Sequence, residues 1–124
     1  MEVYDSHITG GSLQISSDVI EKIARHAAME VEGVHSVVPA MSGARSLLDK
    51  IAPVKPITVE LKNDVADISV SLSVLYGTKI PELSERVQRN VKDAVQNMTS
   101  ISVAKVDVVV AGLVNEPGDS QEVL

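Results

Sequence analysis

The chain has 124 residues, no cysteine and a formal net charge of −6, and these values exclude more than they identify. One domain of this length can bury enough surface to fold without disulfides or a structural metal. Residues 11–114 hold twelve acids and eleven bases, so most of the excess acid lies in the two terminal segments. A near-neutral body disfavours nucleic-acid binding, which draws its affinity from a basic face.

The composition also indicates the kind of core and the compartment. Apolar residues make up 44% of the chain but aromatic residues only 2%, so we expect an aliphatic core. The first residues lack the basic and apolar regions of a secretory signal, and no uncharged run approaches the roughly 20 residues of a membrane-spanning helix. We therefore expect a cytoplasmic protein, and the absence of cysteine fits that reducing compartment.

The first part of the chain predicts a short strand and the start of a helix. Residues 1–10 are interpreted as a disordered N-terminal segment. Leu13 and Ile15 then alternate with polar residues, which indicates a short strand. Three consecutive residues are N-cap candidates: Ser16, Ser17 and Asp18. A helix should therefore begin at about this point.

The helix that follows has one apolar stripe at steps of three and four residues. Its members are Ile20, Ile23, Ala24, Ala27, Ala28 and Val31. The alanines in this stripe allow a close approach to the neighbouring layer. Gly33 is placed to end the helix, and His35–Val38 can form a short strand that Pro39 ends.

Residues 39–56 interrupt the regular pattern. They contain an amphipathic piece of one to two turns with three large apolar residues: Leu47, Leu48 and Ile51. Two interpretations stay open. The segment folds back to cap the core, or it is a contact element for a partner or an anionic surface, because long irregular segments within compact domains are often functional.

Two strands joined by a tight turn come next. Ile57–Lys62 alternates apolar and polar residues, and Asn63 and Asp64 tolerate the positive φ of a hairpin turn. The return strand should bury one face, formed by Ala66, Ile68, Val70, Leu72, Val74 and Tyr76. Its other face should be solvent-facing and includes Ser69, Ser71 and Ser73.

A second helix begins near Pro81, a residue that suits the first turn. Its apolar stripe is formed by Leu83, Val87, Val91, Ala94, Val95 and Met98. Opposite charges stand four residues apart on its outer face, in the pairs Glu82 with Arg86, Glu85 with Arg89 and Arg89 with Asp93. Each such pair contributes only a few tenths of a kcal/mol, so the apolar stripe holds the helix in place.

The last strand places Val106, Val108 and Val110 on one face. A right-handed crossover through the second helix should make this strand parallel to Ala66–Tyr76, adjacent to it or one place away. The predicted fold is α+β, a two-layer sandwich in which a mixed sheet of about four to five strands carries two main helices on one face. We expect one domain over residues 11–114, followed by a flexible acidic tail at 115–124.

No group of residues predicts a catalytic, metal or cofactor site. His26 and Glu30 stand four apart on the first helix, but zinc needs three or four ligands, so an exposed hydrogen-bonded pair is preferred. Glu60 and Asp67 should face each other on an open strand surface, which lacks the enclosure that acid–base work requires. The strand serines have no identifiable base beside them.

The remaining candidate is an apolar patch on the solvent-facing side of the sheet. Strict alternation points Leu75, Val109 and Leu113 away from the helices, at the same end of two strands. We predict a protein-contact or self-association site there, the alternative being that terminal segments or residues 39–56 cover the patch. The predicted partner-contact residues are Leu75, Val109, Leu113, Leu47, Leu48 and Ile51.

Five segments, in order along the chain, carry a resemblance to a known family. They are ISSDVIEKIA at 15–24, EVEGV at 30–34, LYGTKIPEL at 75–83, VQRNVKDAVQNMT at 87–99 and VAKVDVVVAGL at 103–113. Together they resemble the alkaline-shock protein family, also called the glucose-starvation general stress family, of Gram-positive bacteria. Family members tend to have a glycine-rich segment where this chain has Pro39, Pro53 and Pro56, and some carry longer charged tails.

The resemblance implies a small cytoplasmic protein tied to envelope stress or cell-envelope homeostasis, held at the membrane in some members by an integral-membrane partner. It implies no catalytic residues and no cofactor. We therefore predict a non-enzymatic interaction or scaffold module that self-associates. Two alternatives stay open: a nucleic-acid-binding α+β module, and a small-ligand-binding or enzymatic domain, which a cavity with converging polar groups would favour.

Overall fold

The structure is a computed structural model that describes residues 11–39 and 55–115. The predictions for residues 1–10, for most of the segment 39–56 and for the tail beyond residue 115 lie outside the described residues. The same holds for three of the predicted contact residues: Leu47, Leu48 and Ile51.

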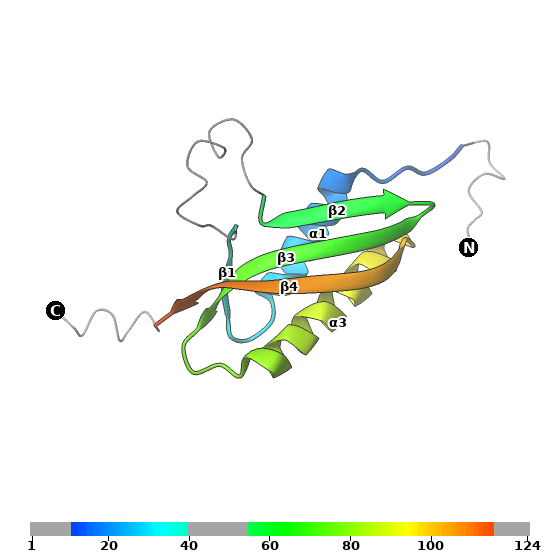
Figure 1. The fold of residues 1–124 in the computed structure, drawn as a ribbon. Coiled ribbons are helices and arrows are strands. Elements are labelled where there is room, and N and C mark those ends of the chain that lie inside the picture. Colours follow the sequence, from blue (N-terminus) through cyan, green and yellow to red (C-terminus); the bar gives the residue numbers. More distant parts are fainter. Residues whose placement is uncertain (1–10, 40–54, 116–124) are drawn as a thin grey trace, which may run out of the picture.

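Two helices and four strands make up the described part of the chain (Figure 1). In chain order they are α1 (Ser17–Met29), β1 (Val34–Val37), β2 (Ile57–Lys62), β3 (Val65–Leu75), α3 (Ile80–Thr99) and β4 (Ser102–Val114). Residues 11–16 form no strand, so the strand predicted at Leu13 and Ile15 is wrong. Alternation alone does not supply a partner strand: Leu13 is 71% exposed, and only Ile15 packs against the core.

β3 is the centre of the sheet, because each of the other described strands pairs with it. β4 runs parallel to β3 along its whole length, from Ser102 beside Val65 to Val114 beside Leu75. The other edge of β3 holds β2 and β1 end to end, both antiparallel to it. The parallel pairing predicted for the last strand is confirmed, and that strand is adjacent to β3. The sheet is therefore mixed.

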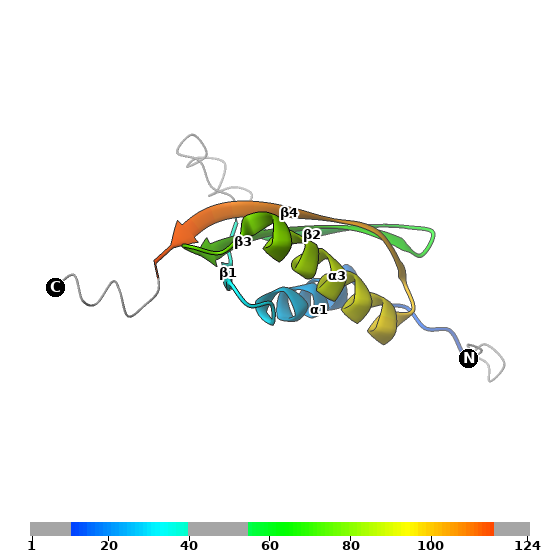
Figure 2. The same ribbon diagram turned by 90° about the horizontal axis from the view of Figure 1, so that it is seen from below.

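Both helices cover the same face of the sheet (Figure 2). α1 packs against β1 and β2, α3 packs against β4, and the two helices contact each other. The opposite face of the sheet carries no described helix. The architecture is the predicted α+β two-layer sandwich.

α1 begins where Ser16 caps it. Ser16 is extended, with φ −78° and ψ 157°, and its side-chain oxygen accepts a hydrogen bond from the Val19 N–H at 3.3 Å. The predicted apolar stripe is confirmed, with Ile23 half-buried and the rest buried: Ile20, Ala24, Ala27, Ala28 and Val31. Gly33, at φ +100°, lies in the turn that follows the helix.

α3 buries a stripe at steps of four: Leu83, Val87, Val91, Val95 and Thr99. Met98 was predicted in this stripe but is 70% exposed. Thr99 takes its place because its hydroxyl donates to the Val95 carbonyl at 2.6 Å and accepts the Ile101 N–H at 3.1 Å, which satisfies the end of the helix inside the core. None of the three charge pairs predicted on α3, all among the described residues, closes into an ion pair.

β3 buries the predicted apolar face, formed by Ala66, Ile68, Val70, Leu72 and Val74. Tyr76 does not belong to it, since β3 ends at Leu75 and the tyrosine is 69% exposed. Ser71 and Ser73, predicted to face solvent, are only 6% and 5% exposed. The reason is that β3 is the central strand, so longer side chains on both neighbouring strands enclose its short hydroxyls.

Candidate functional site

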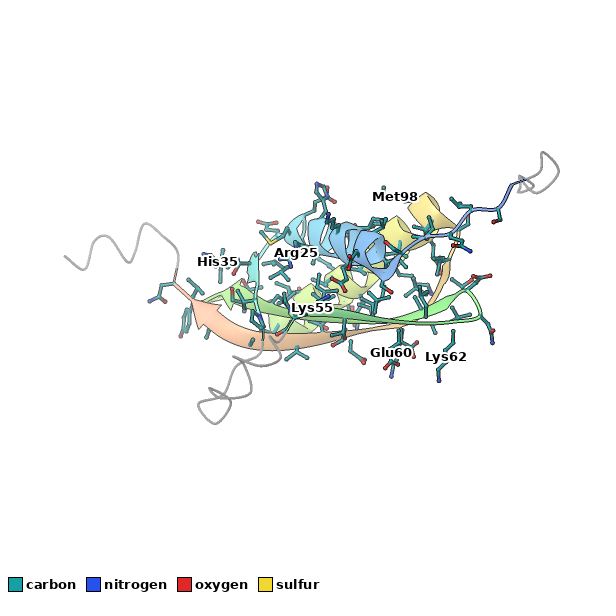
Figure 3. All side chains as sticks on the ribbon, turned by 90° about the horizontal axis from the view of Figure 1, so that it is seen from above. Arg25, His35, Lys55, Glu60, Lys62 and Met98 are labelled. Atoms are coloured by element: carbon teal, nitrogen blue, oxygen red, sulfur yellow. The ribbon has the colours of Figure 1, made fainter. Side chains whose placement is uncertain are left out.

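The face of the sheet opposite the helices is not covered by any described helix (Figure 2). Figure 3 shows Glu60 and Lys62 pointing away from the helices on this side, while Met98 lies on the helix side. The turn that follows β2 confirms the hairpin prediction, with Asn63 at φ 53° and Asp64 at φ 65°. We call this surface the open face.

The hairpin end of the open face is charged. Glu60 lies in register with Asp67, as predicted, and Lys105 of β4 lies on the other side of Asp67. The Lys105 ammonium is 3.8 Å from the Asp107 carboxylate, and both side chains are 61% exposed. These groups are solvated rather than enclosed, so they form no site for acid–base chemistry.

The other end of the open face carries hydroxyl and apolar groups. The Ser73 Oγ lies 2.9 Å from the Ser36 Oγ and 3.4 Å from the His35 Nδ1. The Ser71 Oγ is buried and has no hydrogen-bond partner among the described residues. A buried hydroxyl without a partner loses its hydration and gains nothing in return.

The backbone of Ser71 marks the place where β1 ends and β2 begins. Its carbonyl accepts the Val38 N–H at 3.1 Å, and its N–H donates to the Pro56 carbonyl at 2.8 Å. On the other side, Ser71 lies in register with Val109 of β4, which is 41% exposed. The unpartnered hydroxyl therefore lies next to an exposed apolar side chain.

The structure brings two of the predicted patch residues to the open face and separates the third. Leu75 and Val109 both face this side, about four residues or roughly 13 Å apart along the strands. A register shift after Leu72 of β3 inserts one residue into β4, which puts Leu113 beside the core residue Val74. Strict alternation therefore gave the wrong face for Leu113, which is 56% exposed at the end of the sheet.

Gly112 was the sequence signal for this irregularity. It lies in register with Ser73, and a Cβ atom built on it would be 3.5 Å from the Ser73 Cβ, so it faces the open side. A glycine inside a strand often marks a bulge. Sequence reasoning placed Ser71 and Ser73 on this face but missed their burial, because serines at alternate positions look like ordinary solvent-facing residues.

A shallow groove lies on the other side of the molecule, between the two helices. Its volume is ≈ 500 Å³, and it is lined mainly by apolar groups, together with Lys22, His26 and Glu30. The His26 Nδ1 is 3.4 Å from a Glu30 carboxylate oxygen, which makes the predicted exposed pair. Asn90 donates to the Ala27 carbonyl at 2.7 Å and so ties α3 to α1.

Two polar groups of this groove, His26 and Glu30, bond to each other. Within residues 11–39 and 55–115, no third histidine, cysteine or carboxylate joins His26 and Glu30 to form a metal-binding group. In the same ranges, neither helix combines the length and apolar character that a membrane crossing requires.

The comparisons with known proteins give one family and several uncharacterised relatives. The model of the alkaline-shock protein 23 family, described by a "cell envelope-related function", matches residues 5–115. The uncharacterised protein YqhY of Bacillus subtilis (strain 168) is 32% identical over 114 residues, which cover 91% of this chain and 83% of YqhY. The uncharacterised protein Spy1535 of Streptococcus pyogenes serotype M6 is 34% identical over 109 residues, which cover 86% of this chain and 81% of Spy1535.

Solved structures titled MamM CTD resemble the fold only loosely. One of them matches 77% of this chain and 93% of its own, with a TM-score of 0.48 and 13% sequence identity. A likeness at this level carries no argument about function.

Proposed function

Because the chain belongs to the alkaline-shock protein 23 family, whose function is related to the cell envelope, we propose that it is a non-enzymatic interaction module that works there by self-association. Its contact surface is the end of the open face that carries Leu75 and Val109. One observation carries the proposal: Val109 has a 41% exposed aliphatic side chain on a sheet face that no described helix covers.

Two physical features of this surface favour contact with another protein. An uncovered sheet face with large aliphatic side chains gains free energy when a partner removes it from water. The charged end of the same face, around Glu60 and Lys105, would then remain at the solvated rim.

Two finer features belong to the same proposal and rest on the family resemblance alone. They are a role in the response to envelope stress and recruitment to the membrane by an integral-membrane partner. Self-association would support such recruitment, because several weak contacts held in one assembly bind a membrane-anchored partner with high avidity.

The non-enzymatic part of the proposal is supported by the geometry at Ser73. This serine comes closest to a nucleophile–base arrangement, with its Oγ 3.4 Å from the His35 Nδ1. The same Oγ lies 2.9 Å from the Ser36 Oγ, and Ser73 is only 5% exposed. Its hydroxyl is therefore enclosed by neighbouring groups, whereas a nucleophile must be accessible to its substrate.

A double substitution on the open face tests the proposal. Leu75→Glu with Val109→Glu places two charges on the apolar end, and we expect wild-type circular dichroism but loss of self-association in sedimentation velocity. Lys62→Glu is the matched control, since it changes the net charge by the same two units at an exposed position of β2 on the same face, at the hairpin end and away from the patch. If the double variant sediments as the wild-type protein does, the open face is not the contact surface.

A further inference from the structure

One edge of the sheet is only partly protected against pairing with another strand. β3 is paired on both edges, whereas β4 pairs only with β3 among the described strands, so the outer edge of β4 faces outward along the whole strand. Unpaired N–H and C=O groups on such an edge form a template for another strand.

α3 covers the first half of this edge with two glutamine side chains. The Gln96 Oε1 accepts the Val103 N–H at 3.0 Å, and the Gln88 Nε2 donates to the Val106 carbonyl at 3.1 Å. These bonds point away from β3, whereas at the end of β4 the Val114 carbonyl accepts the Tyr76 N–H at 2.7 Å and so points toward β3. They show which groups of β4 are directed outward.

Between the two register shifts of β4, every second residue points its backbone N–H and C=O groups outward, away from β3. Val106–Val110 runs in regular register with Ile68–Leu72. A strand residue points its N–H and C=O to the same side, so Val108 and Val110 present theirs outward, as Val106 does. No described side chain bonds to these groups of Val108 and Val110.

The residue types in Val106–Val110 do not oppose pairing with a strand of another chain. Natural edge strands are protected by lysine, proline or inward charges. Val106–Val110 reads Val-Asp-Val-Val-Val, which contains one acid and neither lysine nor proline. Within this stretch, Val109 adds a 41% exposed apolar side chain.

We propose that two copies of the chain join through this edge, with β4 antiparallel to β4 and Val108 of one copy opposite Val110 of the other. The inference rests on the self-association in the proposed function and moves its centre to the β4 edge, where Val109 belongs to both the open face and the edge. A two-fold axis then passes beside Val109, and the two copies share one continuous sheet with all helices on the same side.

The register follows from which backbone groups are available. Pairing Val108 with its own copy would set Val110 against Val106, whose carbonyl Gln88 already occupies. Pairing Val110 with its own copy would set Val108 against Gly112, which lies beyond the register shift and no longer points outward. Pairing Val108 with Val110 uses only open groups, and it places Asp107 opposite Ala111 instead of another acid.

The groove next to this edge carries balanced charge. It lies between α3 and β4, and its charged lining consists of three acids and three bases: Glu85, Asp93, Asp107, Arg89, Lys92 and Lys105. This balance gives a uniformly charged partner no net attraction and a second copy no net repulsion. A second copy is therefore compatible with the charge at this edge.

Disulfide formation tests the arrangement, since the natural chain has no cysteine. Val109→Cys should cross-link two copies under mild oxidation, because Val109 meets its own copy at a Cα separation of about 4.5 Å, within disulfide range. Thr58→Cys is the control, on the same face but on the far side of β3. We expect cross-linking at least ~10-fold faster for Val109→Cys than for Thr58→Cys.

A second pair of variants separates edge pairing from face-to-face packing. Mixing Val108→Cys with Val110→Cys should give a mixed disulfide dimer, because these side chains lie on the helix side of the sheet and meet only at a shared edge. If the wild-type protein sediments as an oligomer but the two cysteine variants form no mixed disulfide, edge pairing is wrong while self-association is retained. A wild-type protein that stays monomeric at every concentration would overturn both. Thermal unfolding of the reduced variants, matched to wild type, shows that they fold.

Discussion

Gly33 and Gly77 both adopt a positive φ, yet only one of them is also crowded. Gly33 has φ +100°, and a Cβ added there would lie 2.8 Å from the Thr78 Cγ2 and 2.9 Å from the Leu83 Cδ1. Gly77 has φ +96° and nothing within 4 Å of the same added atom. The two glycines therefore separate backbone strain from close packing.

Alanine at the two positions should have unequal effects. Gly77→Ala should lower the free energy of unfolding by about 1 kcal/mol, the cost of left-handed backbone for an L residue. Gly33→Ala should lower it by a further 1 to 3 kcal/mol or so, because the new methyl group must displace its neighbours. Urea unfolding of both variants measures the difference. Equal losses would show that Thr78 and Leu83 move aside without cost.

Removal of two buried hydroxyls should have different effects on the free energy of unfolding. The Thr99 hydroxyl donates to the Val95 carbonyl and accepts the Ile101 N–H, so Thr99→Val should cost about 1 to 3 kcal/mol by leaving that N–H unpaired. Ser71 has no partner, so Ser71→Ala should leave the stability of the monomer unchanged or raise it by up to about 1 kcal/mol. Chemical denaturation at low protein concentration checks both. A large loss for Ser71→Ala would mean that its hydroxyl is bonded after all.

At the scale of elements, α3 is held by its buried stripe rather than by its surface charges. Val91 is fully buried, whereas Arg89 is exposed and forms no ion pair with another described residue. Burial of a large aliphatic side chain contributes roughly 1.5 to 3 kcal/mol, several times the value of an exposed charge pair. The stripe therefore dominates the attachment of the helix to the sheet.

This difference predicts contrasting substitutions on one helix. Val91→Asp should unfold the domain, because an unpaired carboxylate in the core costs several kcal/mol, comparable with the whole stability of a small domain. Arg89→Ala should change the free energy of unfolding by no more than about 0.5 kcal/mol. Thermal melts followed by circular dichroism measure both variants. Comparable losses would contradict the assignment of Val91 to the core.

For the whole molecule, the balance of charge decides between protein and nucleic-acid partners. Arg86, Arg89 and Lys92 are the densest bases on α3, but Glu82, Glu85 and Asp93 lie among them. Phosphate binding requires a continuous basic face, and no such face is built from this helix.

We therefore expect no submicromolar binding to duplex DNA or to RNA at low salt. A filter-binding titration measures the affinity, and its repetition at higher salt measures the number of phosphate contacts. Tight binding with a steep loss on adding salt would favour the nucleic-acid alternative over the interaction module.

The sequence alone determined both helices, the main strands and the layering of this protein. Periods of three to four predicted both helices, periods of two predicted the β2–β3 hairpin, and the crossover rule predicted that β4 is parallel to β3. These patterns are local, and each indicates which face of a helix or strand is buried. For the same reason the family resemblance, which rests on those elements, was recognisable from the sequence.

Only the tertiary structure decided which residues form the candidate site. Strict alternation assigned Leu113 to the open face, but a register shift in β4 moved it, and a shift depends on how two strands align. Ser71 and Ser73 became buried because β3 is central, which no single strand reveals. Likewise, the outward groups of Val108 and Val110 exist because β4 lies at an edge. Neighbours across the sheet fix these properties, and neighbours are set by the assembled fold rather than by local pattern.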